Sequence, residues 1–430
     1  MPAEAGVPRG RQDKGKDWRM IMSSVNKHTD TGRRAGAGEI AAAAVLEILG
    51  ALLLFYAGYK AVWEGVDFET HIAIADAVDF AHFGAFISRH FEPLWHICVH
   101  VLGQALGLET IRAAGLVTGA CHALTYLTAC HLVRRLTRKP SPPVAAFLCV
   151  LLGIAAAIYV PWFNKLPYLG QGSPNVWHNP TNNMVRPIGL LVFGLTAIEL
   201  ARLKEDRFRS SARAAIVIPS ALLLVLSTLA KPSFVQIYYP ALFLIMLIWL
   251  FYSKGANLKH CLQFFLMCLP SLAVMILQYI RAFYSSNKDA GGVSIAPFRA
   301  AGFYTDNVGI SLLLVTAFPL FMLLVSLLKR EFRVCDGFAL LIFLSGLAER
   351  MLLVEEGSRE YHGNFSWGYM LALYYLWFCA IRQYLALWAC GRKKSGLDIF
   401  LQVLASVLLA LHVLSGIYYL YYILILHNGV

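Results

Sequence analysis

The feature that most constrains this chain is a long apolar run that recurs along most of its length. A bilayer core is crossed by roughly 20 residues of helix, so runs of about 18 to 23 apolar residues predict membrane-spanning helices. Backbone groups in lipid must hydrogen-bond within their own segment, which favours helices over strands. The composition agrees, with 58% hydrophobic and only 14% charged residues. We therefore predict an all-α fold, a polytopic bundle of membrane helices.

Eleven segments qualify as spans, and a twelfth apolar segment, Pro93–Leu106, is too short to be one. That segment also contains His96 and His100, which are unfavourable inside lipid. We expect it to form a juxtamembrane helix on the outer face. The predicted spans are 40–60, 112–133, 143–162, 187–203, 214–230, 235–253, 260–281, 309–328, 335–354, 367–388 and 398–426.

Lys and Arg are unevenly distributed between alternate connections. With eleven spans and the N-terminus inside, the inner segments hold 25 of the 37 Lys and Arg residues and the outer segments hold nine. This bias follows the positive-inside rule and explains the net charge of +12 without a nucleic-acid partner. We expect a multi-pass protein of the plasma membrane, with a cytoplasmic N-terminus and an extracytoplasmic C-terminus. Residues 1–38 are predicted to be a disordered basic cytoplasmic tail, and 39–430 a single transmembrane domain.

The first outer loop, 61–111, is acidic and rich in His. Asp67 and His71 are four residues apart and would share one face of a helix. A carboxylate beside apolar walls has a raised pKa and can act as a general base. Two other interpretations stay open for this loop, a solvated amphipathic helix and a zinc site that combines His71 with Asp67.

Two uncharged or weakly charged outer segments, 171–184 and 358–369, resemble each other in content. Amide groups donate and accept hydrogen bonds, which suits sugar hydroxyls, and an indole ring offers a flat apolar face. Trp177, His178 and Asn182 in the first segment and His362 in the second are therefore candidate substrate-binding residues. The alternative is a pair of interfacial caps in the aromatic belt of the membrane.

Cations on the outer side are candidates for holding an anionic substrate. Lys231 follows an apolar helix and precedes a Pro, while Arg281 and Arg359 lie in other outer segments. Arg can hold a phosphate through two hydrogen bonds, and Lys holds it as a point charge. Each of these cations could instead be an ordinary charge at the membrane interface.

The opening of the chain resembles the GT-C superfamily of integral membrane glycosyltransferases. One span is followed by an outer acid, then by "EPLWH" at 92–96 and by "IRAAGLVTGACHALTYLTACHLVRRLTRK" at 111–139. The stretch "TLAKPSF" at 228–234 is also similar to one seen in such enzymes. The resemblance covers about the first 135 residues and Lys231.

The resemblance implies a GT-C-like fold with an outer-face juxtamembrane helix and a polyprenyl-phosphate-type sugar donor. It also implies that an Asp or Glu soon after the first span is the catalytic carboxylate. Here "DFETH" offers both Asp67 and Glu69, so the choice between them stays open. Glu92 and His96, which begin and end the "EPLWH" stretch, and His71 are expected to contribute to substrate binding.

We therefore expect an inverting membrane glycosyltransferase that transfers a hexose or pentose on the extracytoplasmic face. Its partners would be a lipid-linked sugar donor, a glycan, lipid or protein acceptor, and membrane lipids, with no nucleic acid. No Cys or His spacing typical of a metal site occurs, so we assign no metal ligands. No cofactor is certain, and a divalent metal stays open. The alternative functions are a transporter or flippase of a lipid-linked glycan and a non-catalytic membrane scaffold.

Overall fold

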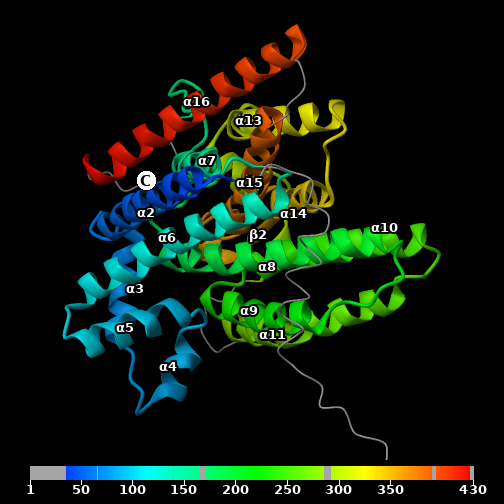
Figure 1. Ribbon diagram of the computed structural model, residues 1–430. Helices are drawn as coiled ribbons and strands as arrows, with labels where there is room; N and C mark the ends of the chain where they lie inside the picture. Colours follow the sequence, from blue (N-terminus) through cyan, green and yellow to red (C-terminus); the bar gives the residue numbers. More distant parts are fainter. Residues whose placement is uncertain are drawn as a thin grey trace, which may run out of the picture.

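The computed structural model describes residues 35–64, 66–138, 140–164, 170–284, 292–389 and 394–426. Helices dominate these residues (Figure 1), as expected for an all-α bundle. Most of the predicted tail, residues 1–34, lies outside the described residues. The helices are α2 (Ala37–Ala61), α3 (Val66–Asp76), α4 (Phe83–Arg89), α5 (Leu94–Leu106), α6 (Thr110–Leu136), α7 (Pro142–Ile154), α8 (Pro180–Glu205), α9 (Ala214–Ala230), α10 (Ser233–Tyr252), α11 (Leu258–Tyr284), α12 (Arg299–Tyr304), α13 (Val308–Leu328), α14 (Val334–Leu352), the 3-10 turn η1 (Gly357–Arg359), α15 (Ser366–Ala389) and α16 (Gly396–Leu424).

The strands among the described residues are two short segments, one between α11 and α12 and one directly after α14. β1 (Val293–Ile295) pairs antiparallel with β2 (Leu353–Glu355), and Ser294 lies opposite Val354. This small antiparallel pair joins the segment before α12 to the end of α14.

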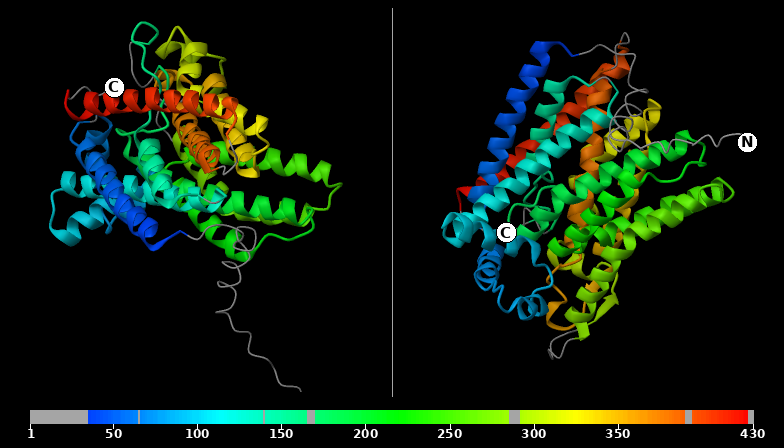
Figure 2. Two further views of the ribbon diagram at one scale, coloured as in Figure 1. Left: turned by 45° about the horizontal axis from the view of Figure 1, so that its top comes forward. Right: turned by 60° about the horizontal axis from the view of Figure 1, so that its bottom comes forward.

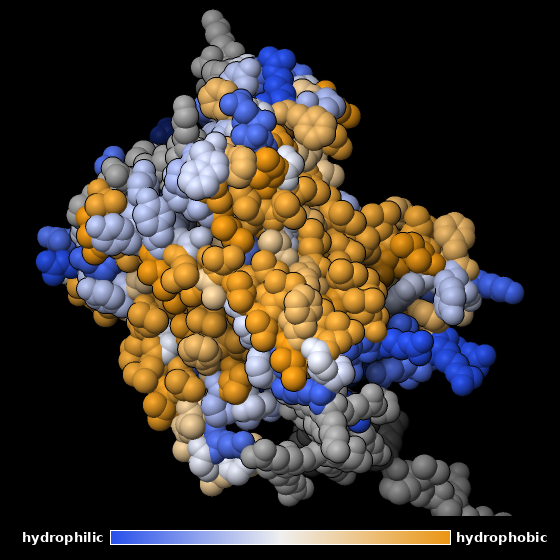
Figure 3. All heavy atoms as spheres, turned by 90° about the horizontal axis from the view of Figure 1, so that it is seen from above, coloured by the Kyte–Doolittle hydropathy of each residue, from blue (hydrophilic) through white to orange (hydrophobic). Residues whose placement is uncertain are grey.

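Eight of the described helices are long and apolar enough to cross a membrane, namely α2, α6, α8, α10, α11, α13, α15 and α16. The other three predicted spans also form helices, but α7 has 13 residues, α9 has 17, and α14 carries three charged residues. The eight apolar helices fit a multi-pass membrane protein. One face of the molecule presents a broad hydrophobic surface with hydrophilic residues at its margins (Figure 3).

The predicted span 143–162 is wrong in its C-terminal half, because α7 ends at Ile154. Asn175 donates its side-chain amide to the carbonyl oxygens of Leu152 and Ala155, at 2.7 and 2.8 Å. The ring of His412 bonds the carbonyl of Ala156 at 2.7 Å. Side chains from distant segments thus occupy the carbonyls at this helix end, so the chain can leave the helix without unsatisfied groups.

α2 and α6 lie side by side (Figures 1 and 2) and run antiparallel. Gly115 and Gly119 of α6 allow this close approach, since a Cβ added at Gly119 would lie 2.7 Å from the carbonyl oxygen of Phe55. Small residues four apart are the usual means by which membrane helices pack tightly. The opposite ends of the same two helices are joined by the ion pair of Glu47 with Arg134, at 2.5 Å.

The ion pairs whose carboxylates are completely buried lie at one end of the bundle, which we call the basic end. There Glu199 is fully buried and pairs with Arg202 and Arg213. Asp336 and Arg382 also pair at this end, at 2.7 Å, with both side chains completely buried. The rest of the cations at this end lie on the connections that the positive-inside rule assigned to the inner face.

The other end, which we call the site end, gathers the first outer loop and the later outer segments. α3, α4 and α5 lie there (Figure 2), and α5 packs against α6, α8 and α9. α5 ends at Gly107, whose left-handed φ of 61° is typical of a helix C-terminus. The predicted juxtamembrane segment Pro93–Leu106 therefore exists as a separate short helix.

We predict that Gly119→Ala weakens the packing of α2 on α6. The added methyl group would collide with the backbone of α2 at Phe55, and overpacking of this kind costs about 1–3 kcal/mol. Thermal unfolding in detergent should show a lower midpoint than the parent protein. Gly309→Ala is the matched control, because a Cβ there has no neighbour within 4 Å. Equal unfolding midpoints for the two variants would contradict the packing argument.

Candidate functional site

The start of α8 positions Asp67. Asn179 caps this helix, since its Oδ1 accepts the backbone N–H of Asn182 at 3.0 Å and the hydroxyl of Thr181 at 3.1 Å. Pro180 follows at the first helical position, where its fixed φ suits a helix start. The Nδ2 of Asn179 then donates to Oδ2 of Asp67 at 3.0 Å. One amide therefore holds both the helix terminus and the carboxylate on α3.

Lys231 connects three further segments at the same place. Its Nζ donates to Oγ1 of Thr181 at 3.1 Å and lies 3.5 Å from Oε2 of Glu92. It also lies 5.2 Å from the centre of the Trp367 ring, a cation–π distance. Lys231 is only 8% exposed, although it lies between two helices. The cation thus sits inside the protein, in contact with the residues around Asp67.

His71 and His96 form a pair beside Lys231. Nδ1 of His71 lies 2.8 Å from Nε2 of His96, and Nδ1 of His96 lies 2.9 Å from the carbonyl oxygen of Glu92. Burial, then the charge on His96 and that on Lys231, lower the pKa of His71 to about 3. Burial is also the largest cause that lowers the pKa of His96 to about 4. Both rings are therefore neutral near pH 7.

His178 completes the group of contacts. Its Nδ1 lies 3.3 Å from the hydroxyl of Tyr419, and its ring is 5.9 Å from that of Trp367. Burial lowers the pKa of His178 to about 4, although the nearby Asp67 opposes the shift. We call the following residues the site cluster: Asp67, His71, Glu92, His96, His178, Asn179, Thr181, Lys231 and Trp367.

The segment 170–183 is buried along its whole length and carries polar atoms without protein partners. Asn182 is 0% exposed, and neither its Nδ2 nor its Oδ1 has a hydrogen-bond partner among the described residues. Oδ1 of Asn183 and Nε1 of Trp177 are also buried without a hydrogen-bond partner among the described residues. Buried amides are nearly always satisfied, so we expect ordered water beside these atoms.

The structure places Trp177 inside the bundle, packed against another ring. Its indole is 0% exposed and stacks on His122, with ring centres 4.3 Å apart and planes 6° apart. A face that already packs on an imidazole inside the bundle is not open to a sugar ring. Trp367, which the sequence analysis did not select, is the indole that lies against Lys231 and His178.

Three other predicted residues lie outside the site cluster. Glu69 is exposed, because two residues along a helix reverse the direction of the side chain relative to Asp67. Arg281 donates from Nη1 to the carbonyl of Ile87 at 3.3 Å and so contacts the segment that leads to Glu92. His362 lies on the connection between β2 and α15, and its backbone N–H donates to the backbone carbonyl of Arg359 on that connection.

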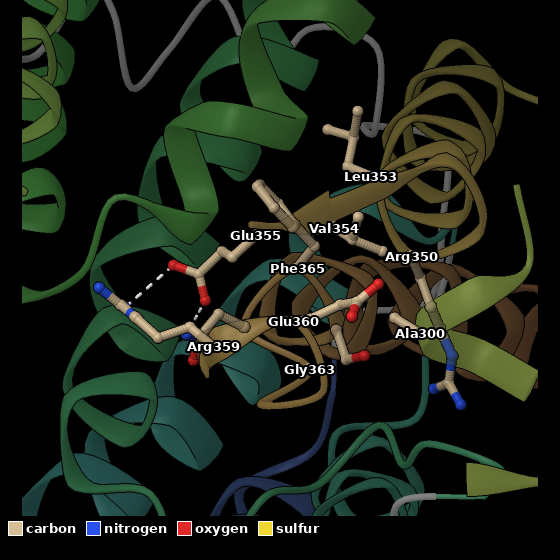
Figure 4. Close-up of a pocket in the computed structure, with 11 residues that line it drawn as sticks. Ala300, Arg350, Leu353, Val354, Glu355, Arg359, Glu360, Gly363 and Phe365 are labelled. Atoms are coloured by element: carbon tan, nitrogen blue, oxygen red, sulfur yellow. Dashed lines mark hydrogen bonds and ion pairs between the residues drawn. The ribbon is translucent and has the colours of Figure 1, made fainter. Parts of the chain in front are cut away.

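Arg359 lines a separate small pocket beside β2, which also includes Arg350, Glu360 and Asn364 (Figure 4). Its guanidinium pairs with the buried carboxylate of Glu355 at 2.9 Å. Arg359 therefore pairs with an acid of its own connection, whereas Lys231 pairs with Glu92.

Within the described residues, one group of three side chains is spaced for a metal ion, and it lies at the basic end. It consists of Cys335, Asp336 and Cys379, all buried. Both oxygens of Asp336 already accept from Arg382, at 3.2 and 2.7 Å. A bidentate guanidinium is the stronger competitor for this carboxylate, which favours an ion pair over a metal.

We predict that the site cluster makes the folded protein sensitive to acid. In the unfolded chain His71 and His96 take up protons with the ordinary pKa of 6.5. In the folded chain their pKa values are lowered to about 3 and about 4, so both rings stay neutral until the pH is much lower. Unfolding free energy should therefore fall as the pH drops below 6.5, by at most about 2 kcal/mol per histidine at pH 5.

The measurement is thermal unfolding in detergent at about pH 7.5 and pH 5. His71→Asn should lose less stability on acidification than the parent, because the variant lacks one of the depressed groups. His82→Asn is the control, since His82 is exposed and pairs with Asp79. An identical acid response in all three proteins would show that these rings are not held neutral by the fold.

No protein-family model matches the chain, and no curated protein matches it.

Proposed function

We propose that this protein is a membrane glycosyltransferase that uses a polyprenyl-phosphate-type sugar donor. The observation that carries the proposal is the convergence of Asp67, Lys231 and the polar segment 170–183 on one end of the bundle. In glycosyl transfer from a lipid phosphate, a carboxylate can act as the general base, a buried cation can stabilise the leaving phosphate, and unsatisfied amides can bind sugar hydroxyls. These groups come from segments far apart in the sequence.

In this mechanism Asp67 removes the proton from the acceptor hydroxyl as the oxygen attacks the anomeric carbon of the donor. The bond between that carbon and the phosphate oxygen breaks, and the phosphate keeps the electron pair. Lys231 stabilises the negative charge that develops on the leaving phosphate. Asn179 holds the carboxylate of Asp67 in place, since its amide donates to Oδ2.

The sugar ring would meet the start of α8. Asn182 is fully buried and offers both a donor and an acceptor without a protein partner among the described residues. A sugar hydroxyl can satisfy both functions at once. Trp367, next to Lys231, is the indole available for the face of the ring or for the lipid phosphate end.

The same proposal includes the membrane arrangement. α9 and α14 would cross together with the eight longer helices, and α7 would cross together with the buried, non-helical residues 155–157 that follow it, giving about 11 crossings in a GT-C-like fold. The basic end would face the cytoplasm, because its connections carry most of the Lys and Arg residues. The site end would then face outward from the plasma membrane, with the C-terminus on that side.

We predict that Asp67→Asn abolishes transfer without unfolding the protein. Asn keeps an oxygen that can accept from Asn179, but it cannot take a proton, and loss of a general base costs about 10²–10⁴ in rate. Glu69→Gln is the matched control on the same helix, because Glu69 is exposed. The assay follows transfer by the purified protein from a panel of polyprenyl-phosphate sugars.

If Glu69→Gln lost activity and Asp67→Asn kept it, the base would be Glu69 and the reaction class would stand. If the parent bound such donors and moved them across liposome membranes without transfer, the transporter or flippase would replace the enzyme.

We predict that Lys231→Met weakens binding of the donor phosphate. A charge-assisted contact of this type is worth about 1.5–3 kcal/mol, or roughly 10-fold to 100-fold in affinity. Because the variant leaves Glu92 without its cation, the double variant Lys231→Met/Glu92→Gln is the control for folding. Equilibrium binding of a fluorescent lipid phosphate is the measurement. Parent-like affinity in both variants would remove Lys231 from the proposed site.

A further inference from the structure

The contacts of His96 determine which ring nitrogens carry protons. A carbonyl oxygen can only accept, so Nδ1 of His96 must donate to the carbonyl of Glu92. In a neutral ring Nε2 is then the acceptor, and the 2.8 Å contact requires that Nδ1 of His71 is the donor. Nε2 of His71 is therefore left with the lone pair.

The position of His71 is rigidly defined. Its ring stacks on His96, with centres 5.1 Å apart, and meets the fully buried Trp95 edge-on at 6.1 Å. Nε2 of His71 has no hydrogen-bond partner among the described residues, and it is not one of the enclosed orphan atoms. It is thus the nitrogen of His71 that can accept a proton, held in place by the pair and not fully enclosed.

Glu92 joins this pair to Lys231. Its backbone carbonyl holds His96, and its carboxylate lies 3.5 Å from Nζ of Lys231. Lys231 is the permanently charged cation of the site cluster, and Glu92 already balances its charge. Asp67 adds a further negative charge. A phosphodiester donor would bring one more, giving three negative charges against one positive charge, and an added proton would reduce this excess in a partly buried site.

We propose that Nε2 of His71 takes up a proton when the phosphate of the donor binds beside Lys231, and delivers that proton to the departing phosphate oxygen. The inference rests on the proposed glycosyl transfer and assigns His71 as the general acid of the leaving group. It also assigns His96 as a positioning residue, because its contact keeps the basic nitrogen of His71 on Nε2.

The step balances in atoms and charge. The carbon–oxygen bond of the donor breaks, and its electron pair stays on the phosphate oxygen. That oxygen receives the proton of Nε2, while Asp67 receives the proton of the acceptor hydroxyl. The lipid phosphate leaves as a protonated monoester, and His71 returns to the neutral form until the next donor binds.

The charged groups around the pair make proton uptake depend on the ligand. Burial is the largest cause that lowers the pKa of both rings; the charges on His96 and then Lys231 lower that of His71 further, and those on His90 and then Lys231 lower that of His96. His100 is engaged with the carbonyl of Ala75, and Asp67 lies one helical turn from His71. An anion beside Lys231 would offset the repulsion from this cation and would itself attract a protonated His71, so both effects favour proton uptake when the donor binds.

The test is the number of protons taken up on binding, measured by titration calorimetry at about pH 7 in two buffers of different ionisation enthalpy. The probe is an isoprenyl methyl phosphate, a diester that has no titrating group near this pH. We expect uptake of about one proton by the parent and by the control His82→Asn. His71→Asn keeps an amide N–H for His96 but lacks the basic nitrogen, so it should bind with little uptake.

A second measurement uses the unaltered protein, so it does not depend on how the variant folds. Spectra of ¹⁵N-labelled histidine should show one doubly protonated ring after the probe is added. Binding of the probe without proton uptake would overturn the role of His71 and leave the glycosyltransferase proposal intact. Absence of both binding and transfer with every isoprenyl phosphate donor would overturn the proposed function itself.

Discussion

The side chain of Asn179 is the contact on which the arrangement of the site end depends. Its oxygen caps α8 through Asn182 and Thr181, and its nitrogen holds Asp67 on α3. A cap substitution typically costs about 1 kcal/mol, but here the same amide also joins the first outer loop to the bundle. Thr181 then passes the connection to Lys231. The helix start, the carboxylate and the cation are thus placed by one short polar segment.

A buried polar segment inside an apolar bundle needs partners, and this need shapes the surrounding helices. Asn175 bonds the carbonyls at the end of α7, so this helix stops well before the predicted boundary. Asn182 and Trp177 keep polar atoms without partners among the described residues, so ordered water is expected beside them. At the basic end the buried polar groups are instead satisfied by ion pairs, such as that of Asp336 with Arg382.

The sequence predicted several members of the site cluster because their residue types are unusual for their surroundings. Asp67 and Lys231 are charges next to apolar runs, and His178 lies in a polar segment between two such runs. The dipeptide Asn179-Pro180 is a helix-start signal that could have identified the cap. Nothing in the sequence could show that Trp367 lies over Lys231 or that Trp177 stacks on His122, since both contacts join residues more than 50 positions apart.

The sequence by itself determined the class of fold, because apolar run length and the lack of water in lipid leave helices as the usable structure. It also determined which connections are basic, since charge does not depend on packing. Only the tertiary structure decided where α7 ends, which acid is held toward Lys231, and which nitrogen of His71 is free. These outcomes depend on hydrogen bonds between distant segments, and such bonds form only when the helices have packed.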